Sequence, residues 1–350
     1  MAGAPSYDPP GAVNLFSDTQ TRPTAAMRSA IAEAAVGDEQ RGVDPTVNAL
    51  QDRVAELLGH EAALFLPSGT MCNEIAFRLH VRAGGDAIFL HRTSHPLHFE
   101  AGGPAALSGA VLTPLDGPGG MFDAATLEAA LYPPQRYAPR SRVVSVEQTT
   151  NMGGGRVWPL ERMAEVVATA RRHGLRAHLD GARLLNACVA SGRRADEYAA
   201  RFDTAWIDFT KGLGAPVGAC LAGSADLIDE AWRFKQMWGG AMRQAGIVAA
   251  GALYALDHHV DRLADDHARA RRLAEGLAVM PGVTGLDPGE VETNIVVFLV
   301  PDAPAFAAHL AADGVLVVPI DGRRVRAVTH LDVDDEGIDR ALAAARAALA

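Results

Sequence analysis

Lysine is the residue type from which the chemistry of this sequence is best approached. Only two of its 350 residues are lysines, Lys211 and Lys235, against thirty arginines. An arginine stays protonated at any working pH, whereas a desolvated lysine amine can lose its proton and attack a carbonyl carbon. Lys211 follows the apolar run 204–209, which is typical of a buried strand. We therefore expect Lys211 to act as a nucleophile and Lys235 to be a solvated helix residue.

An acidic residue completes the pattern around Lys211. Asp180 lies in the stretch HLDGAR (178–183), at the end of the preceding apolar run. A lysine and an acid after successive strands predict a site for pyridoxal phosphate (PLP), in which the lysine forms a Schiff base and the carboxylate pairs with the pyridinium nitrogen. A lysine after a strand is in many proteins only a loop cation, and codon bias also depletes lysine. The prediction of a PLP site therefore depends on Lys211 and Asp180 occurring together.

A phosphate-binding turn is expected earlier in the chain. Ser68, Gly69 and Thr70 fall where the apolar run 62–66 turns into a helical pattern. The backbone N–H groups there would converge on an anion at the positive end of the helix dipole. A simple helix cap is the alternative for these three residues taken alone.

The composition narrows the class of protein. The net charge of −10 and the pI near 5.6 argue against nucleic acid or anionic membranes as partners. No stretch reaches the roughly 18 uninterrupted apolar residues that a membrane span requires, and the N-terminus lacks the pattern of a signal peptide. Cys72, Cys188 and Cys220 are widely scattered, so we expect a reducing cytoplasm, no disulfide framework and no metal site.

Helical patterns alternate with short apolar runs, which predicts an α/β fold with a mostly parallel sheet. We expect a short arm at residues 1–16, a large domain at 17–250 and a small α/β domain at 251–350, with the helical stretch 245–278 interrupted near 257–259. The expected strands are 62–66, 87–90, 110–112, 142–146, 175–179, 204–209, 293–300, 315–319 and 325–329, and the clearest helices are 46–58, 71–81, 164–173 and 336–348.

The ordered motifs identify a family. The sequence resembles the threonine aldolase and β-eliminating lyase family of PLP enzymes over almost its whole length. The matching stretches are SDTQTRPT (17–24), DPTVN (44–48), PSGTM (67–71), EAGG (100–103), GGRV (154–157), HLDGAR (178–183), KGLGAPVG (211–218), GGAMRQAG (239–246) and RAVTHLDV (326–333). The resemblance implies a PLP-dependent transferase fold of type I, with a seven-stranded type of sheet in the large domain.

The resemblance also implies roles for individual residues. Lys211 would bind PLP, Asp180 would keep its ring nitrogen protonated, and Ser68, Gly69 and Thr70 would hold its phosphate. His95 would stack on the ring and could take a proton from the β-hydroxyl of the substrate, since an imidazole titrates near neutrality.

The substrate side of the site follows from the same resemblance. The residues expected to bind the substrate are Ser17, Thr150, Arg183 and Arg326, and Arg183 is also expected at the cofactor. Arginine suits the α-carboxylate because its planar fork donates two hydrogen bonds at once. The implied reaction is the cleavage of a β-hydroxy-α-amino acid, similar to threonine or allo-threonine, to glycine and an aldehyde. The implied assembly is a homodimer or homotetramer with a shared active site.

Two segments depart from the family pattern. The usual ENTHN reads EQTTN at 147–151, so Thr150 stands where a histidine is expected. Arg41 stands where a tyrosine is usual. Both changes could shift the preference toward an acidic, bulky or α-substituted substrate. His98 could supply the missing imidazole, although a structural role is the simpler expectation.

Other chemistries share Lys211 and Asp180. A β-eliminating lyase or an aminotransferase would use the same pair, and only its products would distinguish it from an aldolase. A PLP-fold protein without catalysis, serving as a regulatory module, is a further class. The intact lysine, acid and phosphate turn count against that class.

Overall fold

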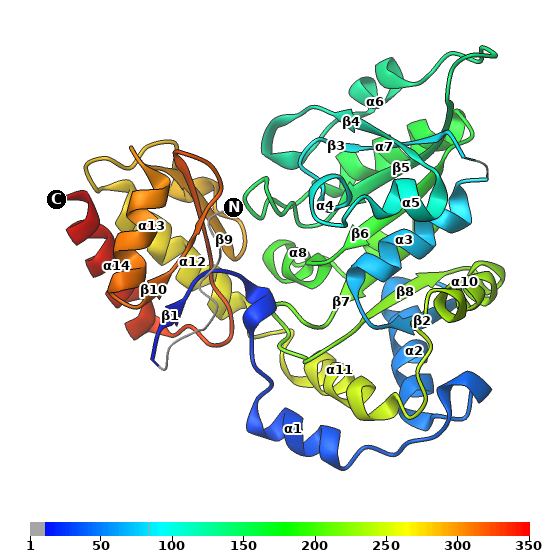
Figure 1. Ribbon diagram of the computed structural model, residues 1–350, viewed down its shortest axis with the longest axis horizontal. Coiled ribbons are helices and arrows are strands. Elements are labelled where there is room, and N and C mark those ends of the chain that lie inside the picture. Colours follow the sequence, from blue (N-terminus) through cyan, green and yellow to red (C-terminus); the bar gives the residue numbers. More distant parts are fainter. Residues whose placement is uncertain (1–10, 83) are drawn as a thin grey trace.

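A seven-stranded sheet forms the centre of the larger of two units (Figure 1). The computed structural model describes residues 11–82 and 84–350. The strand order is β2-β8-β7-β6-β5-β3-β4, and the five strands from β7 to β4 run parallel. This confirms the expected mostly parallel sheet. The strands are β2 (Ala62–Leu66), β3 (Asp86–His91), β4 (Val111–Leu115), β5 (Arg140–Glu147), β6 (Arg176–Gly181), β7 (Thr204–Asp208) and β8 (Ala219–Gly223).

One strand of this sheet was not expected from the sequence. Strand β8 is antiparallel to both of its neighbours, β2 and β7, and all five of its residues are buried. Its sequence, ACLAG, contains no β-branched or aromatic residue, which are the types that favour strands. It becomes a strand because it pairs with β2 on one side and with β7 on the other, and β2 is distant in sequence.

Helices cover both faces of the sheet, because alternate strand residues point to opposite faces. On one face, Ala63 and Phe65 join a large core with α2, α7, α9 and α11; on the other, Leu64 and Leu66 pack with α3 and α10. The helices of the larger unit are α1 (Ala25–Ala32), α2 (Pro45–Leu58), α3 (Gly69–His80), α4 (His95–His98), α5 (Gly103–Ser108), α6 (Ala124–Ala130), α7 (Leu160–Arg172), α8 (Leu184–Ser191), α9 (Ala195–Ala199), α10 (Ala225–Met237) and α11 (Gly246–His258), with short 3₁₀ turns at Asp18–Gln20, Glu39–Arg41 and Pro118–Gly120.

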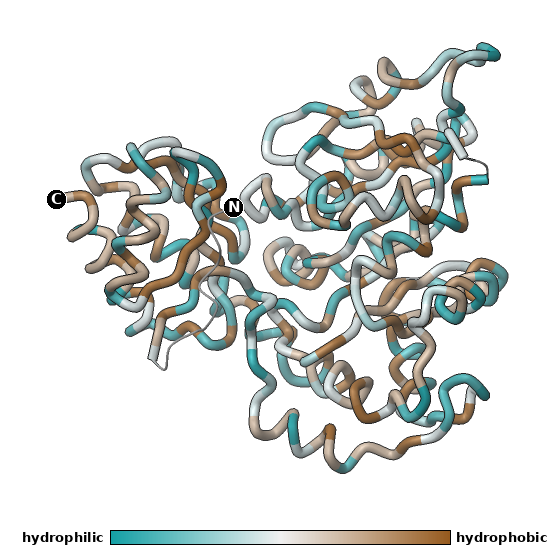
Figure 2. Tube along the Cα trace, in the orientation of Figure 1, coloured by the Kyte–Doolittle hydropathy of each residue, from teal (hydrophilic) through white to brown (hydrophobic). Residues whose placement is uncertain are grey.

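The smaller unit has its own core. An antiparallel sheet of order β11-β12-β9 packs against three helices, and β9 and β12 supply buried residues such as Val296, Phe298 and Val325. Figure 2 shows the hydrophobic segments concentrated in strands such as β9 and those of the central sheet. The elements are α12 (Leu263–Ala278), a 3₁₀ turn at Pro288–Glu290, β9 (Ile295–Leu299), α13 (Ala303–Ala312), β10 (Val315–Leu316), β11 (Val318–Pro319), β12 (Arg324–Val328) and α14 (Asp335–Leu349).

The N-terminal segment crosses to the smaller unit. Strand β1 (Val13–Asn14) pairs in parallel with Val315 and Leu316 of β10, and the two lie side by side in Figure 1. Val13 and Leu15 belong to the smaller core. The segment that carries Ser17 is therefore fixed at the junction of the two units. The rest of the expected arm, residues 1–10, lies outside the described residues.

The two cores meet along the long helical stretch. It is interrupted between His258 and Leu263, which agrees with the expected break near 257–259. Helix α11 packs on α1 and α2, and its residues Ala249 and Ala252 belong to the large core, whereas Ala270 and Leu273 of α12 belong to the small one. Among the described residues, no helix is long and apolar enough to cross a membrane.

The expectation for Lys235 was wrong. Its side chain is completely buried in α10, where its amine forms an ion pair with Glu39 and lies 4.6 Å from the centroid of the Trp232 ring. Burial lowers the pKa of Lys235, and the negative charge of Glu39 opposes that shift. The sequence could not reveal the partner, because Glu39 is 196 positions away.

Replacing Lys235 with methionine should destabilise the protein strongly. The change keeps the side-chain volume but leaves the buried Glu39 carboxylate without a partner, so the free energy of unfolding should fall by about 3–5 kcal/mol. Denaturant-induced unfolding measures this loss. Adding Glu39→Gln should recover most of it, because the remaining buried charge is removed. A loss below about 1 kcal/mol in the single variant would contradict the buried ion pair.

Candidate active site

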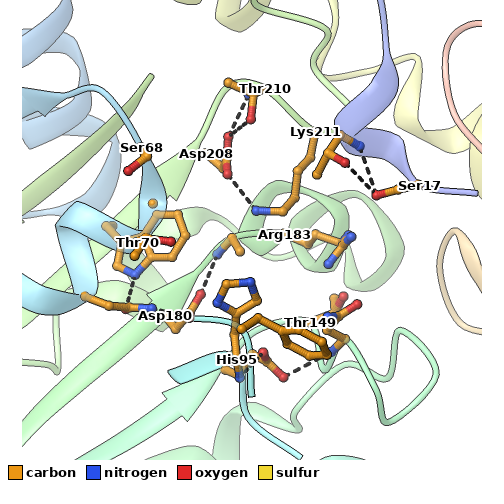
Figure 3. A pocket seen from close by; sticks show the side chains of 18 of the residues that line it. Ser17, Ser68, Thr70, His95, Thr149, Asp180, Arg183, Asp208, Thr210 and Lys211 are labelled. Atoms are coloured by element: carbon orange, nitrogen blue, oxygen red, sulfur yellow. Dashed lines mark hydrogen bonds and ion pairs between the residues drawn. The ribbon is translucent and has the colours of Figure 1, made fainter. Parts of the chain in front are cut away.

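A cavity of about 350 Å³ lies at the junction of the two units. Most of its lining comes from the larger unit, while Arg326 comes from β12 and Ser17 from the segment after β1. It opens beside the carboxyl ends of β5, β6 and β7, the edge at which open α/β sheets bind ligands. Figure 3 shows Lys211 and His95 reaching toward it from opposite sides.

Three adjacent parallel strands each carry an acidic residue of this lining at or next to their carboxyl end. They are Glu147 on β5, Asp180 on β6 and Asp208 on β7, and Glu147 pairs in register with Asp180. Parallel strands bring such residues together because their carboxyl ends lie on one edge. The acids give the cavity a concentration of negative charge, which cationic groups must balance.

Lys211 lies just past the end of β7. Its Nζ donates to Asp208 Oδ2 over 2.6 Å and lies 5.6 Å from the centroid of the Trp206 ring. The hydroxyl of Thr21 donates to the carbonyl groups of Thr210 and Lys211, which fixes the backbone of this turn. The amine is therefore held in the cavity by one acid and is close to an aromatic face.

Asp180 is buried and its hydrogen-bond acceptors are already partly used. Its Oδ2 accepts from Asn73 Nδ2 over 2.9 Å, and its Oδ1 accepts from the Ala182 amide over 3.1 Å. Burial raises the pKa of Asp180, and the hydrogen bond from Asn73 opposes that shift. A cation placed against this carboxylate would hold it in the charged form.

A hydrogen-bond chain behind Asp180 fixes the orientation of Asn73. Because Asn73 Nδ2 donates to carboxylates, its Oδ1 must accept, and it does so from Trp206 Nε1 (2.7 Å) and His178 Nε2 (3.0 Å). Burial lowers the pKa of His178 to about 3, so the ring is neutral and its Nδ1 accepts from Thr204 Oγ1. The Asn73 amide is thus held with its N–H groups toward Asp180.

The first turn of α3 lies against Trp206. Ser68 caps the helix by accepting from the Met71 amide, and Ser68, Gly69 and Thr70 all line the cavity. A methyl group on Gly69 would lie 2.2 Å from the Trp206 ring, so only glycine lets the backbone come this close. The Met71 amide is taken by this cap, whereas the amides of Gly69 and Thr70 precede the hydrogen-bonded part of the helix and can donate to an anion.

His95 lies at the start of α4, facing the cavity. Its Nδ1 donates to Glu100 Oε1 over 2.8 Å. Nε2 is therefore the ring nitrogen that remains for chemistry in the cavity. Burial alone would lower the pKa of His95, but the hydrogen bond to Glu100 and the charge of Asp180 outweigh burial and raise it. The imidazole can therefore take up a proton near neutral pH.

Glu147 is a titratable group that the sequence did not single out. Its Oε1 accepts from the His95 amide (3.3 Å) and its Oε2 from the Asn151 amide (3.0 Å). Burial and the neighbouring charge of Asp180 raise the pKa of Glu147 to about 7. A carboxyl group with this pKa can exchange a proton at neutral pH.

The two arginines in the lining have different surroundings. Arg183 donates from Nε and from Nη2 to the two oxygens of Asp18, over 2.7 and 2.6 Å. Arg326 donates to Asn151 Oδ1 and to the Phe16 carbonyl, and its buried Nε has no partner in the described structure. Burial, together with the charge of Arg183, lowers the pKa of Arg326 to about 10. Among the described residues, no ion pair neutralises Arg326.

Known relatives match the chain over almost its whole length. Residues 14–302 match the family model of the beta-eliminating lyases. The chain is 40% identical over 343 residues to the low specificity L-threonine aldolase of Escherichia coli K12, covering 97% of this chain and 99% of that protein. It is 37% identical over 326 residues to low-specificity L-threonine aldolase 1 of Arabidopsis thaliana, covering 91% of each. The chain belongs to the threonine aldolase and β-eliminating lyase family.

Solved structures share the fold of this family member. A threonine aldolase of Leishmania major matches with a TM-score of 0.82 at 21% identity, covering 96% of this chain and 99% of that one. A serine palmitoyltransferase of Sphingomonas wittichii matches with a TM-score of 0.73 at 21% identity, covering 96% and 87%. Together with the family, they confirm the PLP-dependent fold of type I.

The geometry of this β-eliminating lyase family member fits PLP. The turn at Gly69 offers N–H groups for a phosphate, Asp180 is a buried acceptor for a protonated ring nitrogen, and the Lys211 amine projects into the same cavity. His95 approaches from the side opposite Lys211 (Figure 3), where a ring could stack. The donor set therefore matches an anionic, aromatic aldehyde cofactor.

Not every expected site residue lines the cavity. Lys211, His95, Asp180, Ser68, Gly69, Thr70, Ser17, Arg183 and Arg326 do. Thr150 does not: it is fully buried, packs against Gly120 and Gly153, and its hydroxyl accepts from the Arg156 amide. Its neighbours Thr149 and Asn151 line the cavity instead, and a contact between Thr150 and the substrate stays a prediction.

His98 and Arg41, the other residues considered where the sequence departs from the family pattern, also lie outside the cavity lining. His98 donates from Nε2 to the Arg92 carbonyl, which agrees with a structural role. Arg41 is exposed at the end of a 3₁₀ turn and does not line the cavity of its own chain.

Several lining residues were missed in the sequence. They include Asn73, Glu147, Thr149, Trp206 and Asp208. The signal for Glu147 and Asp208 was an acid at the end of each apolar run, repeated on three strands. Asn73 carried no such signal, because its role follows from four hydrogen bonds to distant residues.

Proposed function

We propose that this enzyme is a PLP-dependent carbon–carbon lyase that cleaves a β-hydroxy-α-amino acid, of the threonine or allo-threonine kind, to glycine and an aldehyde. The observation that carries the proposal is the placement of the Lys211 amine and the buried Asp180 carboxylate in one cavity with an anion-binding turn. The relatives named as low-specificity L-threonine aldolases support the same reaction.

The residues that would hold the cofactor have separate tasks. Lys211 supplies the amine, the turn at Gly69 supplies phosphate N–H donors, and Asp180 balances the charge of the ring nitrogen. PLP, when bound, provides a sink for the electron pair released at the substrate Cα. Trp206 and His178 keep Asn73 aligned with Asp180, so the carboxylate stays fixed where the ring nitrogen needs it.

Proton transfer at the substrate hydroxyl falls to His95. Its Nδ1 is occupied by Glu100, so its Nε2 is the atom that takes the β-hydroxyl proton as the Cα–Cβ bond breaks. The pKa of His95 is raised, which places this base near neutrality. Glu147 contacts the same loop through the His95 amide and can exchange protons in the same pH range.

The substrate carboxylate fits best against Arg326. Arg183 already uses two donor groups on Asp18, whereas Arg326 has a buried, unpartnered Nε and no acidic partner within residues 11–82 and 84–350. An incoming carboxylate would therefore balance the excess positive charge. Because Arg326 and Ser17 come from the junction with the smaller unit, the placement of that unit orients the substrate.

Lys211→Ala should abolish glycine formation while leaving the fold intact. The purified protein, loaded with PLP, is incubated with L-threonine, L-allo-threonine, phenylserine, 3-hydroxyaspartate and α-methylserine, and the amino acid and aldehyde products are quantified. Lys211→Arg is the matched control, since it keeps the charge beside Asp208 but cannot condense with an aldehyde. The activity of both variants should fall by at least about 10³-fold.

The same products separate the alternative reactions. Ammonia with a keto acid and no aldehyde would mean β-elimination and would overturn the aldolase proposal. A clear preference for 3-hydroxyaspartate or α-methylserine over threonine would indicate an acidic or α-substituted substrate.

Arg326→Gln should weaken substrate binding more than it slows turnover. Losing a charged hydrogen bond to the carboxylate removes about 1.5–3 kcal/mol, which corresponds to a KM raised roughly 10- to 100-fold. Steady-state kinetics with the preferred substrate measure the change. Arg324→Gln, an exposed position on the same strand, is the control and should leave KM unaltered. An unchanged KM in Arg326→Gln would assign the carboxylate to another residue.

We propose a homodimer or homotetramer in a reducing, cytoplasmic compartment. Two segments joined by the hydrogen bond from the Glu39 amide to the Arg243 carbonyl carry exposed apolar side chains, namely Val36, Val43, Met237 and Ile247. Such a surface suits a second copy of the chain, which would also cover Arg41. The three free cysteines, two of them buried, support the reducing compartment.

Light scattering of the purified protein tests the assembly, and cell fractionation tests the compartment. A dimer or larger species is expected, and Met237→Glu with Val43→Glu should shift it toward the monomer, because charges would be buried at the interface. Leu107→Glu, at an exposed position outside these segments, is the control. A monomeric wild type would contradict the proposal.

A further inference from the structure

Among the described residues, three buried carboxylate oxygens of the cluster that supports His95 have no hydrogen-bond donor. They are both oxygens of Glu74 and Oε2 of Glu100. Glu74 lies on α3 and is 3% exposed, and Glu100 lies just before α5 and is 5% exposed. Buried polar atoms almost always have partners, so this cluster requires an explanation.

The other oxygen of Glu100 is fully engaged. Glu100 Oε1 accepts from His95 Nδ1 and from Asn73 Nδ2, both over 2.8 Å. The charged and titratable groups around His95 are Glu100, Asp180, Lys211 and Glu147, whose Oε1 accepts from the His95 amide. Glu74 faces only Glu100 among them. No ion pair to a lysine or arginine is found for Glu74 in the described part of the chain.

Glu74 has no room to turn away from this contact. A methyl group on Gly103, at the start of α5, would lie 2.1 Å from Glu74 Oε1, so the carboxyl group packs directly on that backbone. The turn that carries Gly103 is closed by the bond from its amide to the Glu100 carbonyl. The two carboxyl groups are therefore held against each other by the packing of α3 on α5.

One proton shared between Glu74 and Glu100 removes the repulsion between their carboxyl groups. Two adjacent carboxylates in a buried place cannot both be charged. Burial, the charge of Glu100 and a hydrogen bond to Glu100 together raise the pKa of Glu74 to about 9. At neutral pH Glu74 is then the neutral partner, and its O–H can donate to the free oxygen of Glu100.

We propose that Glu74 is a positioning residue for the reaction: its neutral carboxyl group donates a hydrogen bond to Glu100, which keeps Glu100 as the charged acceptor for His95 Nδ1–H and so leaves His95 Nε2 as the base facing the cavity. This inference rests on the proposed role of His95. Glu74 lies outside the cavity lining, and it adds a third residue to the hydrogen-bonded pair of His95 and Glu100.

The protonation of Glu74 can be observed without any turnover. Infrared spectra of the PLP-loaded protein, with glutamate labelled by ¹³C at its carboxyl carbon, report a carboxylic-acid C=O band that carboxylates lack. At pH 8 the wild type should show this band and Glu74→Gln should not. The band should disappear with a midpoint near pH 9. Glu147→Gln is the control that separates the other glutamate with a raised pKa.

Stability should follow the same proton. Glu74 keeps its proton in the folded state up to about pH 9, whereas the unfolded chain loses it near the ordinary value of 4.5. The folded state therefore binds the extra proton, and stability falls with rising pH across this window. Glu74→Gln cannot ionise, so its melting temperature should rise relative to the wild type from pH 5 to pH 9.

Steady-state kinetics of Glu74 variants test whether the proton on Glu74 affects the function of His95. The wild-type rate should fall near pH 9, where Glu74 loses its proton. Glu74→Gln retains a donor for Glu100, so it should keep kcat within about threefold at pH 8 and should not show this fall. Glu74→Met has similar volume but no donor, and its kcat should fall about 10-fold with little change in KM. Circular dichroism and cofactor absorbance verify that both variants fold and bind PLP.

Two results would overturn the inference. One is the absence of an acid band assignable to Glu74 at pH 8, whatever the activity. The other is an equal kcat for the Gln and Met variants at pH 8. If the protein shows no aldolase activity, the band still decides the protonation of Glu74, so failure of the proposed function is separate.

Discussion

The side-chain amide of Asn73 is the interaction on which the arrangement of the site depends. It makes four hydrogen bonds, as donor to Asp180 and Glu100 and as acceptor from Trp206 and His178. An amide has two donors and two acceptor positions, so this group is fully satisfied and cannot rotate without leaving buried partners unpaired. It ties α3 to β6, to β7 and to the loop that supports His95. The acid for the cofactor ring and the acid behind the base are thereby held at fixed positions.

Charge balance is the second constraint on this cavity. Parallel strands bring Glu147, Asp180 and Asp208 to one edge, which concentrates negative charge where water is scarce. Lys211 neutralises Asp208, and Asp18 neutralises Arg183. In the part of the chain that the structure describes, Asp180 then has no ion-paired cation and Arg326 has no ion-paired acid. The charge of Asp180, on the larger unit, matches a protonated ring nitrogen. The charge of Arg326, on the smaller unit, matches an amino-acid carboxylate.

Particular elements show what sequence patterns can and cannot predict. Strands such as β5 and β6 were predicted because their runs are long and apolar, and the motifs around them identified Lys211 and Asp180. Strand β8 was not predicted, because alanine and glycine carry no strand preference and its neighbours are distant in sequence. Lys235 was misjudged because a lysine in a helical pattern is usually solvated, and only the packing of α10 brings it against Glu39.

The sequence by itself determined the family and the fold type and predicted the residues that would bind the cofactor, because these depend on residue types and their order. The tertiary structure alone decided which way Thr150 faces, which of the two cavity arginines has no acidic partner among the described residues, and which oxygens of the Glu74 and Glu100 cluster lack a donor there. These properties arise from contacts between segments far apart in the chain. Burial then changes the proton affinity of groups such as Glu74 and Glu147, and burial is a property of the folded state that no local pattern encodes.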